Sequence, residues 1–170
     1  MSPQVSAYIG LGSNLDDPRA QIERAVSAIG ELPQSRVGRM SRLYASVPWG
    51  VADQPEFVNA AVELQTSLAA HALLDSLLGI EQQVGRRRDG LRWGPRRIDL
   101  DILVYGDRCV DEPGLQVPHP HLHERAFALE PLFQIAPDLV IPGCGPVAAL
   151  LAAVDRSGCR PLERHGATTE

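Results

Sequence analysis

Residues 98–102 (I-D-L-D-I) alternate strictly between apolar and acidic side chains, and this pattern constrains the fold more than any other in the chain. Alternation with a period of two is typical of a half-buried β-strand, because successive side chains point to opposite faces of a sheet. On such a strand Asp99 and Asp101 share one face, about 6–7 Å apart. Two carboxylates placed in this way repel each other, and a bound metal ion usually relieves that repulsion.

Strand and helix signals follow one another along the rest of the chain in a β-α-β-β-α-β order. Pro18 suits the first turn of a helix, which Asn14 or Asp16 is expected to cap. The order predicts an α+β fold with a ferredoxin-like βαββαβ core, in which helices flank an antiparallel sheet. The expected strands are residues 5–11, 37–45, 57–64 and 98–105, and the expected helices are residues 18–29, 69–84, 124–135 and 147–154.

A chain of 170 residues is most simply one domain, which we expect at residues 1–155, followed by a flexible C-terminal tail at residues 156–170. The three cysteines are odd in number and include no C-x-x-C pair, which argues against a disulfide framework and a structural zinc site. No apolar run reaches about 18 residues, and the N-terminus has no secretory pattern. These features favour a cytoplasmic protein, and we expect a monomer.

The charges are distributed unevenly. The net charge of −5 disfavours a general binder of nucleic acid or of anionic membranes. All 16 basic residues are arginines, for which a biased genome composition is a sufficient reason, but that bias does not explain why six of them fall within residues 86–97. An acidic protein with one arginine cluster is suited to bind a small polyanion. Together with Asp99 and Asp101, the cluster indicates metal-assisted phosphoryl transfer.

The glycines of G-L-G-S-N, residues 10–14, follow an expected strand. A dinucleotide-binding motif would need another glycine at position 15, which is Leu15. A tight turn between a strand and a helix explains Gly10 and Gly12 equally well, and we favour that interpretation. A P-loop is excluded because the chain contains no lysine.

His119, His121 and His123 are interrupted by prolines in and before H-P-H-L-H, which favours a loop with individual hydrogen-bonding histidines over a metal cluster. Trp49 and Trp93 also fall in expected loops, where a large ring has no core to fill. Stacking on a flat heterocycle is one function for such a ring.

The stretch R-W-G-P-R-R-I-D-L-D-I-L, residues 92–103, resembles the signature of the 6-hydroxymethyl-7,8-dihydropterin pyrophosphokinase family. The blocks Y-I-G-L-G-S-N-L, D-Q-P-E-F-V-N-A-A-V, I-E-Q-Q-V-G-R, V-P-H-P and R-A-F-A-L-E-P-L-F-Q-I-A-P occur in the family's order and cover most of the chain. The resemblance implies transfer of the diphosphoryl group of ATP to the hydroxyl of 6-hydroxymethyl-7,8-dihydropterin, with release of AMP, in folate biosynthesis.

The resemblance also implies roles for individual residues. Asp99 and Asp101 would bind two Mg²⁺ ions, with ATP as co-substrate. The catalytic residues it implies are Arg86, Arg96, Asp99 and Asp101. Those at the pterin are Ser46, Val47, Trp49, Phe57, Asn59 and Phe127, and those at ATP are Glu81, Arg88, Trp93, Ile102, His119 and Arg125. The implied partners are these two small molecules, with no nucleic acid and no membrane.

The chain departs from the family pattern mainly where the adenine and ribose are bound, so those contacts are less determined than the metal and pterin contacts. The departures are Trp49, Phe57, Leu78, Gly114, Gln116 and Pro120. Three rival functions differ in a testable way. A kinase that moves one phosphoryl group would release ADP, a ferredoxin-like RNA-binding module would need a basic sheet, and an inactive pterin-binding relative would lack turnover.

Overall fold

The computed structural model describes residues 3–14, 17–47, 55–85 and 98–162. Their helices are α1 (Pro18–Gly30), α2 (Ala70–Gly85), the 3-10 helix η1 (Leu122–Glu124), α3 (Ala126–Ile135) and α4 (Val147–Ala153). The strands are β1 (Val5–Ser13), β2 (Ser35–Met40), β3 (Tyr44–Ser46), β4 (Phe57–Thr66), β5 (Asp99–Tyr105), β6 (Val110–Glu112), β7 (Leu115–Val117), β8 (Val140–Ile141), β9 (Gly145–Pro146) and β10 (Cys159–Pro161).

The main sheet has the strand order β10-β3-β4-β1-β5, and β2 pairs with the remaining length of β4. Every pairing in it is antiparallel. Because β2 and β3 follow each other along the same edge of β4, they together take the place of one strand. The core order is then second, third, first and fourth strand, so the expected ferredoxin-like βαββαβ core is confirmed.

The strand expected at residues 37–45 is interrupted, and a serine hydroxyl accounts for the break. The Ser41 amide donates to the Ala61 carbonyl at 2.9 Å, but the Ala61 amide donates back to the Ser41 hydroxyl, also at 2.9 Å. A side-chain oxygen thus replaces the backbone carbonyl that would continue the ladder. The backbone after Ser41 is free to change direction before β3 begins.

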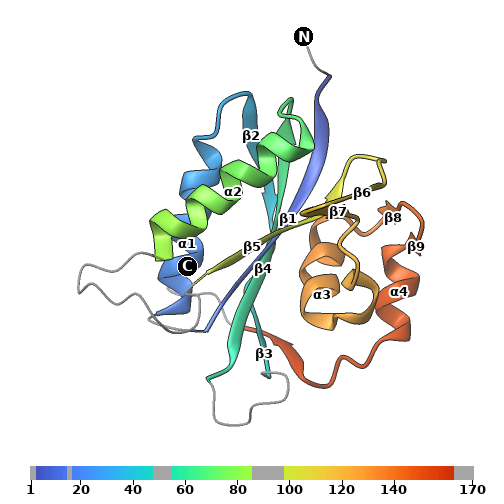
Figure 1. Cartoon of the computed structure of the whole chain (residues 1–170). Coiled ribbons are helices and arrows are strands. Elements are labelled where there is room, and N and C mark those ends of the chain that lie inside the picture. The colour runs from blue at the N-terminus through green and yellow to red at the C-terminus, as the bar shows by residue number, and fades with distance from the viewer. Residues whose placement is uncertain (1–2, 15–16, 48–54, 86–97, 163–170) are drawn as a thin grey trace.

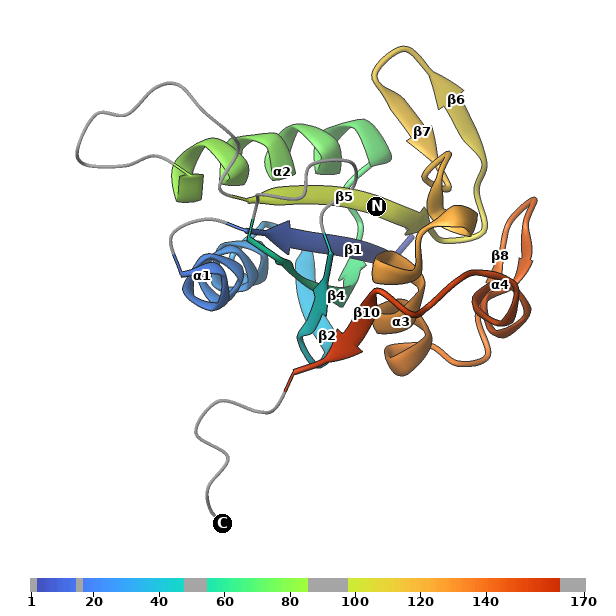
Figure 2. The same ribbon diagram turned by 90° about the horizontal axis from the view of Figure 1, so that it is seen from below.

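Helices cover both faces of the sheet, α1 and α2 on one side and α3 and α4 on the other (Figure 1). Each layer buries its own apolar cluster. The α1 and α2 side includes Ile9, Ile22, Leu64, Leu77 and Leu100, and the α3 and α4 side includes Tyr8, Leu103, Leu129, Leu132 and Leu151. Seen from below in Figure 2, the hairpin of β6 and β7 projects beyond both layers.

The cap of α1 differs from the expected one. Asp17, with a φ of 60°, accepts a hydrogen bond from the Ala20 amide at 3.3 Å, whereas Asn14 or Asp16 was expected to cap this helix. Aspartate tolerates left-handed backbone better than most residues, which lets the cap lie directly before Pro18. Asn14 is buried and donates instead to the Pro55 carbonyl at 3.3 Å.

The chain returns to the sheet after α4. The expected tail begins at residue 156, yet Cys159, Arg160 and Pro161 form β10 and pair with β3. Residues 163–170 lie outside the described part of the chain. The short strands β6 to β9 were also not expected from the sequence. Within the described ranges, none of the helices combines the length and apolar character needed to cross a membrane.

Candidate active site

A cavity of about 560 Å³ opens between the sheet and the start of α3. Strands β1, β3, β4 and β5 form its floor, and the segment from His119 to Ala128 forms its wall. Its lining residues include nine of the predicted site residues, namely Ser46, Val47, Phe57, Asn59, Asp99, Asp101, His119, Arg125 and Phe127. Residues from Gly10 to Ala128 thus meet at one site.

The two aspartates face two glycines across the sheet. Gly10 pairs with Asp101 and Gly12 pairs with Asp99, so each glycine shares a face with the carboxylate beside it. Both glycines therefore lie within β1, paired on both sides, and the interpretation as a tight turn is wrong. Without side chains they leave room above the floor of the cavity beside the carboxylates.

The space at Gly12 is limited by Asn59, because a Cβ atom at position 12 would lie 3.1 Å from Asn59 Oδ1. The Asn59 side chain is buried, and its amide nitrogen donates to the Ser46 hydroxyl at 2.8 Å. This hydrogen bond joins β4 to β3 and fixes which way the amide points. A buried, oriented amide is suited to recognise the polar edge of a ligand.

Two aromatic rings line the same cavity. Phe57 is the first residue of β4, and Phe127 is the second residue of α3. The Arg125 guanidinium carbon lies 5.6 Å from the centre of the Phe127 ring, which is a cation–π contact. Rings, a buried amide and two carboxylates therefore surround one space.

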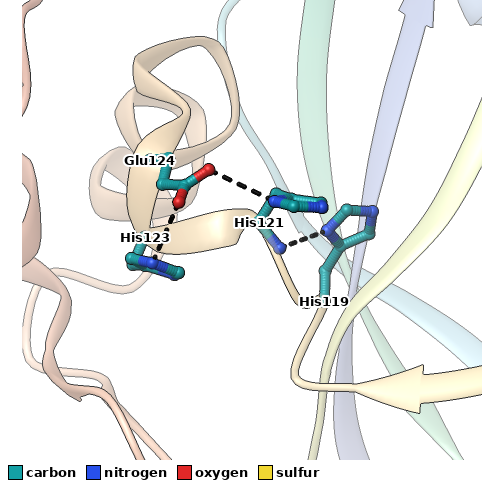
Figure 3. A network of polar contacts seen from close by, with 4 residues as sticks. All are labelled: His119, His121, His123 and Glu124. Atoms are coloured by element: carbon teal, nitrogen blue, oxygen red, sulfur yellow. Dashed lines mark hydrogen bonds and ion pairs between the residues drawn. The ribbon is translucent and has the colours of Figure 1, made fainter.

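The three histidines were expected to hydrogen-bond individually, but the His121 amide and the Glu124 carboxylate link them in one network of polar contacts (Figure 3). The His121 amide donates to Nδ1 of His119 at 3.1 Å, and Glu124 lies 3.2 Å from Nδ1 of His121 and 3.4 Å from Nε2 of His123. Burial lowers the pKa of His119 below 6.5, opposed by Asp101 and assisted by Arg125 and His121. A neutral His119 that accepts at Nδ1 carries its proton on Nε2.

Asp99 and Asp101 are the residues best suited to hold a metal here. In the described ranges no group of three or more histidine, cysteine or acidic side chains could hold an ion. Mg²⁺ commonly takes only one or two carboxylates and completes its shell with water and substrate phosphates. A pair of carboxylates in an open cavity therefore suits a metal that arrives with a phosphorylated ligand.

Two predicted residues lie outside the lining of the cavity. The Glu81 carboxylate in α2 accepts a hydrogen bond from the backbone amide of Leu100 at 2.7 Å, and Leu100 lies between the two aspartates in the sequence. Ile102 is buried in the cluster beneath α1 and α2. Five more predicted residues fall outside the described part of the chain: Trp49, Arg86, Arg88, Trp93 and Arg96.

Some lining residues were not predicted from the sequence. They are Gly10, Leu11, Gly12, Ala60, Leu103, His121, Leu122, Glu124 and Ala128. The two glycines were visible in the sequence but were assigned to a turn. Alternation along β5 points Leu103 to the same side as Asp101, which could have identified it.

Comparison with known proteins identifies relatives along almost the whole chain. A protein of Pseudomonas aeruginosa is 50% identical over 155 residues, 91% of this chain and 95% of the relative. A protein of Methylorubrum extorquens is 46% identical over 92% of this chain and 98% of its own length. Both are named 2-amino-4-hydroxy-6-hydroxymethyldihydropteridine pyrophosphokinase.

The fold recurs in crystal structures of Plasmodium falciparum HPPK-DHPS. One of them, determined with SDX-DHP, has a TM-score of 0.71 and 15% sequence identity, and the match covers 89% of this chain. This chain spans 46% of the length of that one. At this identity the likeness concerns the fold alone.

The fold and the relatives define the class of protein, which is a diphosphotransferase enzyme of the pyrophosphokinase type. Residues 8–137 match the family described as 7,8-dihydro-6-hydroxymethylpterin-pyrophosphokinase. The chain belongs to this family.

Proposed function

We propose that this enzyme transfers the diphosphoryl group of ATP to the hydroxyl of 6-hydroxymethyl-7,8-dihydropterin and releases AMP, as a step of folate biosynthesis. One observation carries the proposal. Asp99 and Asp101 line the same cavity as Phe57, Asn59 and Phe127, so carboxylates suited to a metal and rings suited to stack on a flat heterocycle share one space. The names of the relatives support a dihydropterin as that heterocycle.

In this proposal Asp99 and Asp101 hold two Mg²⁺ ions. The donor set fits, because both side chains offer hard oxygen ligands and Gly10 and Gly12 leave space beside them. When bound, the metal would neutralise charge on the triphosphate and on the leaving AMP. The carboxylates keep the phosphate end of ATP beside β5.

The pterin is assigned to the other end of the cavity, between Phe57 and Phe127. Stacking on both faces and a hydrogen bond from the ring edge to Asn59 would orient the hydroxymethyl group toward β5. Ser46 fixes the Asn59 amide, and Val47 lies at the rim. These contacts place the acceptor hydroxyl near the phosphates.

The nucleotide is assigned to the wall of the cavity. His119 and Arg125 line it there, and the Nε2–H group of neutral His119 can donate to a phosphate or ribose oxygen. The resemblance assigns phosphate handling to Arg86 and Arg96, and nucleotide contacts to Glu81, Arg88, Trp93 and Ile102. It also assigns Trp49 to the pterin.

The chemistry needs no side-chain base in this account. The acceptor oxygen attacks the β-phosphorus, the bond between that phosphorus and the oxygen bridging to the α-phosphorus breaks, and the hydroxyl proton is lost to solvent. Positioning and charge neutralisation account for most of the rate enhancement in phosphoryl transfer. We further propose that the enzyme acts as a cytoplasmic monomer, a setting consistent with three free cysteines.

Product identity tests the proposal. The protein is incubated with ATP, Mg²⁺ and 6-hydroxymethyl-7,8-dihydropterin, and the nucleotide products are separated by chromatography. We expect AMP and a pterin diphosphate in equal amounts, and at least a hundredfold lower rate for Asp99→Asn and for Asp101→Asn, roughly the loss of a main electrostatic group. Asp107→Asn, an exposed carboxylate in the turn after β5, is the matched control.

The other outcomes are equally informative. ADP as product would identify a kinase that moves one phosphoryl group on the same fold. Pterin binding without turnover would identify an inactive relative. A normal rate in the Asp99→Asn variant would remove the aspartates from the proposed metal site.

A further inference from the structure

We propose that residues 156–162 are part of the framework of the active site, and that Gly158 and Arg160 are positioning residues for its pterin end. The inference rests on the proposed function, because it assigns these residues an effect on the pterin substrate. Neither residue lines the cavity itself. They act through Val47, which lines the cavity, and through Glu56, which directly precedes the lining residue Phe57.

The backbone of this segment supports β3. Cys159 pairs with Ser46, the Val47 amide donates to the Gly158 carbonyl at 3.1 Å, and the Leu162 amide donates to the Leu43 carbonyl at 2.8 Å. Strand β3 has only three residues, and its other neighbour is β4. So short a strand gains much of its order from being paired on both sides.

Two side-chain contacts connect the same segment to the edge of the cavity. Arg160 Nη2 lies 2.7 Å from Glu56 Oε1, and Glu56 is the residue directly before Phe57 in the sequence. Gly158 packs so closely on Val47 that a Cβ atom at position 158 would lie 2.6 Å from Val47 Cγ2. One segment therefore contacts the chain both after β3 and before β4.

An ion pair anchors the segment to the layer of helices. The Arg156 guanidinium contacts the Glu130 carboxylate of α3 through two hydrogen bonds, at 2.6 and 3.1 Å. Figure 2 shows the chain passing from α4 across α3 to β10. The segment is therefore held at one end by α3 and pairs at the other end with β3.

These contacts predict an effect on one substrate only. Ser46 pairs with β10 through its backbone, and its hydroxyl accepts the hydrogen bond that orients Asn59. Asp99 and Asp101 lie on β5, with β4 and β1 between them and β3. A small displacement of β3 should therefore weaken pterin binding and leave the binding of ATP unchanged.

The first test uses the ion pair between Arg160 and Glu56. We expect Arg160→Gln and Glu56→Gln each to raise KM and Kd for the pterin about two- to fivefold, as for a partly exposed pair, with KM for ATP unchanged. The double variant should lose no more than either single variant. The control is Arg108→Gln, which removes one exposed charge just after β5, at the end of that strand away from Asp99 and Asp101.

The second test uses the contact of Gly158 with Val47. Gly158→Ala should raise KM for the pterin about fivefold, since one added methyl group in a tight contact displaces its neighbour. In a Val47→Ala background the same change should have little effect, because the clashing Cγ2 atom is absent. Melting temperatures are measured for every variant.

Unchanged pterin KM and Kd in Arg160→Gln and Gly158→Ala, with an active wild type, would overturn the inference. A lower melting temperature with unaltered pterin affinity would do the same, because it would show a merely structural role. A wild type that forms no pterin diphosphate would instead contradict the proposed function, so the two failures are distinguishable.

Discussion

At the scale of single residues, the cavity depends on Gly10 and Gly12 as much as on the carboxylates beside them. Each glycine pairs with one aspartate of β5. A side chain at either position would point into the space that we assign to the metal and the phosphates. There is little room for a side chain at either glycine. A Cβ atom at position 10 would lie 3.2 Å from the Leu103 side chain, and one at position 12 would lie 3.1 Å from Asn59 Oδ1.

Gly12→Ala is therefore expected to weaken pterin binding about tenfold, because the methyl group presses on the Asn59 amide. Fluorescence titration with the pterin measures this. Gly79→Ala is the matched control, since a Cβ atom there meets nothing within 4 Å in α2. It should leave binding unchanged and stabilise the fold by about 0.5–1 kcal/mol. Equal pterin affinity in both variants would contradict the account of Gly12.

His119 is expected to titrate below pH 6.5 in the folded protein, because burial lowers its pKa. The unfolded chain then binds a proton first as the pH falls, so the folded state loses stability below about pH 6.5 and keeps it above that value. The stability deficit of His119→Asn should accordingly shrink between pH 7 and pH 5.5. A deficit that grows toward low pH, measured by urea unfolding, would contradict this sign.

Cys159 should be the slowest of the three cysteines to alkylate. Burial, with Glu130 nearby, raises its pKa to about 11, and Arg156 only partly opposes this. At pH 8 only about one thiol in a thousand would be ionised at such a pKa, and the thiolate is the reactive form. Cys109 and Cys144 are exposed. Mass spectrometry after iodoacetamide treatment should show Cys159 unmodified when these two are labelled, and equal labelling would refute the prediction.

At the scale of elements, α1 offers a clean test of its observed cap. Asp17→Ala removes the bond to the Ala20 amide and places alanine at a φ of 60°, so we expect a loss of about 1–3 kcal/mol in the free energy of unfolding. Asp17→Asn keeps the cap and tolerates this backbone, and it should cost less than about 1 kcal/mol. Urea unfolding measures both. Equal losses would show that the cap has no role.

The elements differ in how far the sequence could predict them. The long helices and β1, β4 and β5 carry clear periodicity, and all were expected within a few residues of their ends. The break at Ser41 could not be predicted, because it depends on a hydroxyl bonding to a strand 20 residues away. Strand β10 reads C-R-P, which is short and partly polar, and only its pairing with β3 makes it a strand.

At the scale of the whole molecule, the site lies where the α3 layer meets the sheet. The alternation of residues 98–102 was sufficient to predict that Asp99 and Asp101 share a face, because strand geometry is local. The presence of Phe127 in the same cavity as Phe57 was implied by resemblance alone, since nothing local specifies how α3 packs. The same limit explains why Gly10 and Gly12 were assigned to a turn, for which glycine is the commonest signal.

We propose that one cavity holds the metal between the aspartates and the triphosphate, and the pterin between the two phenylalanines. A crystal structure with Mg²⁺, a non-hydrolysable ATP analogue and 6-hydroxymethylpterin tests it most directly. We predict metal density at Asp99 and Asp101, and the pterin ring stacked between Phe57 and Phe127 with its edge at Asn59. Metal bound elsewhere, or a pterin outside this cavity, would contradict the account.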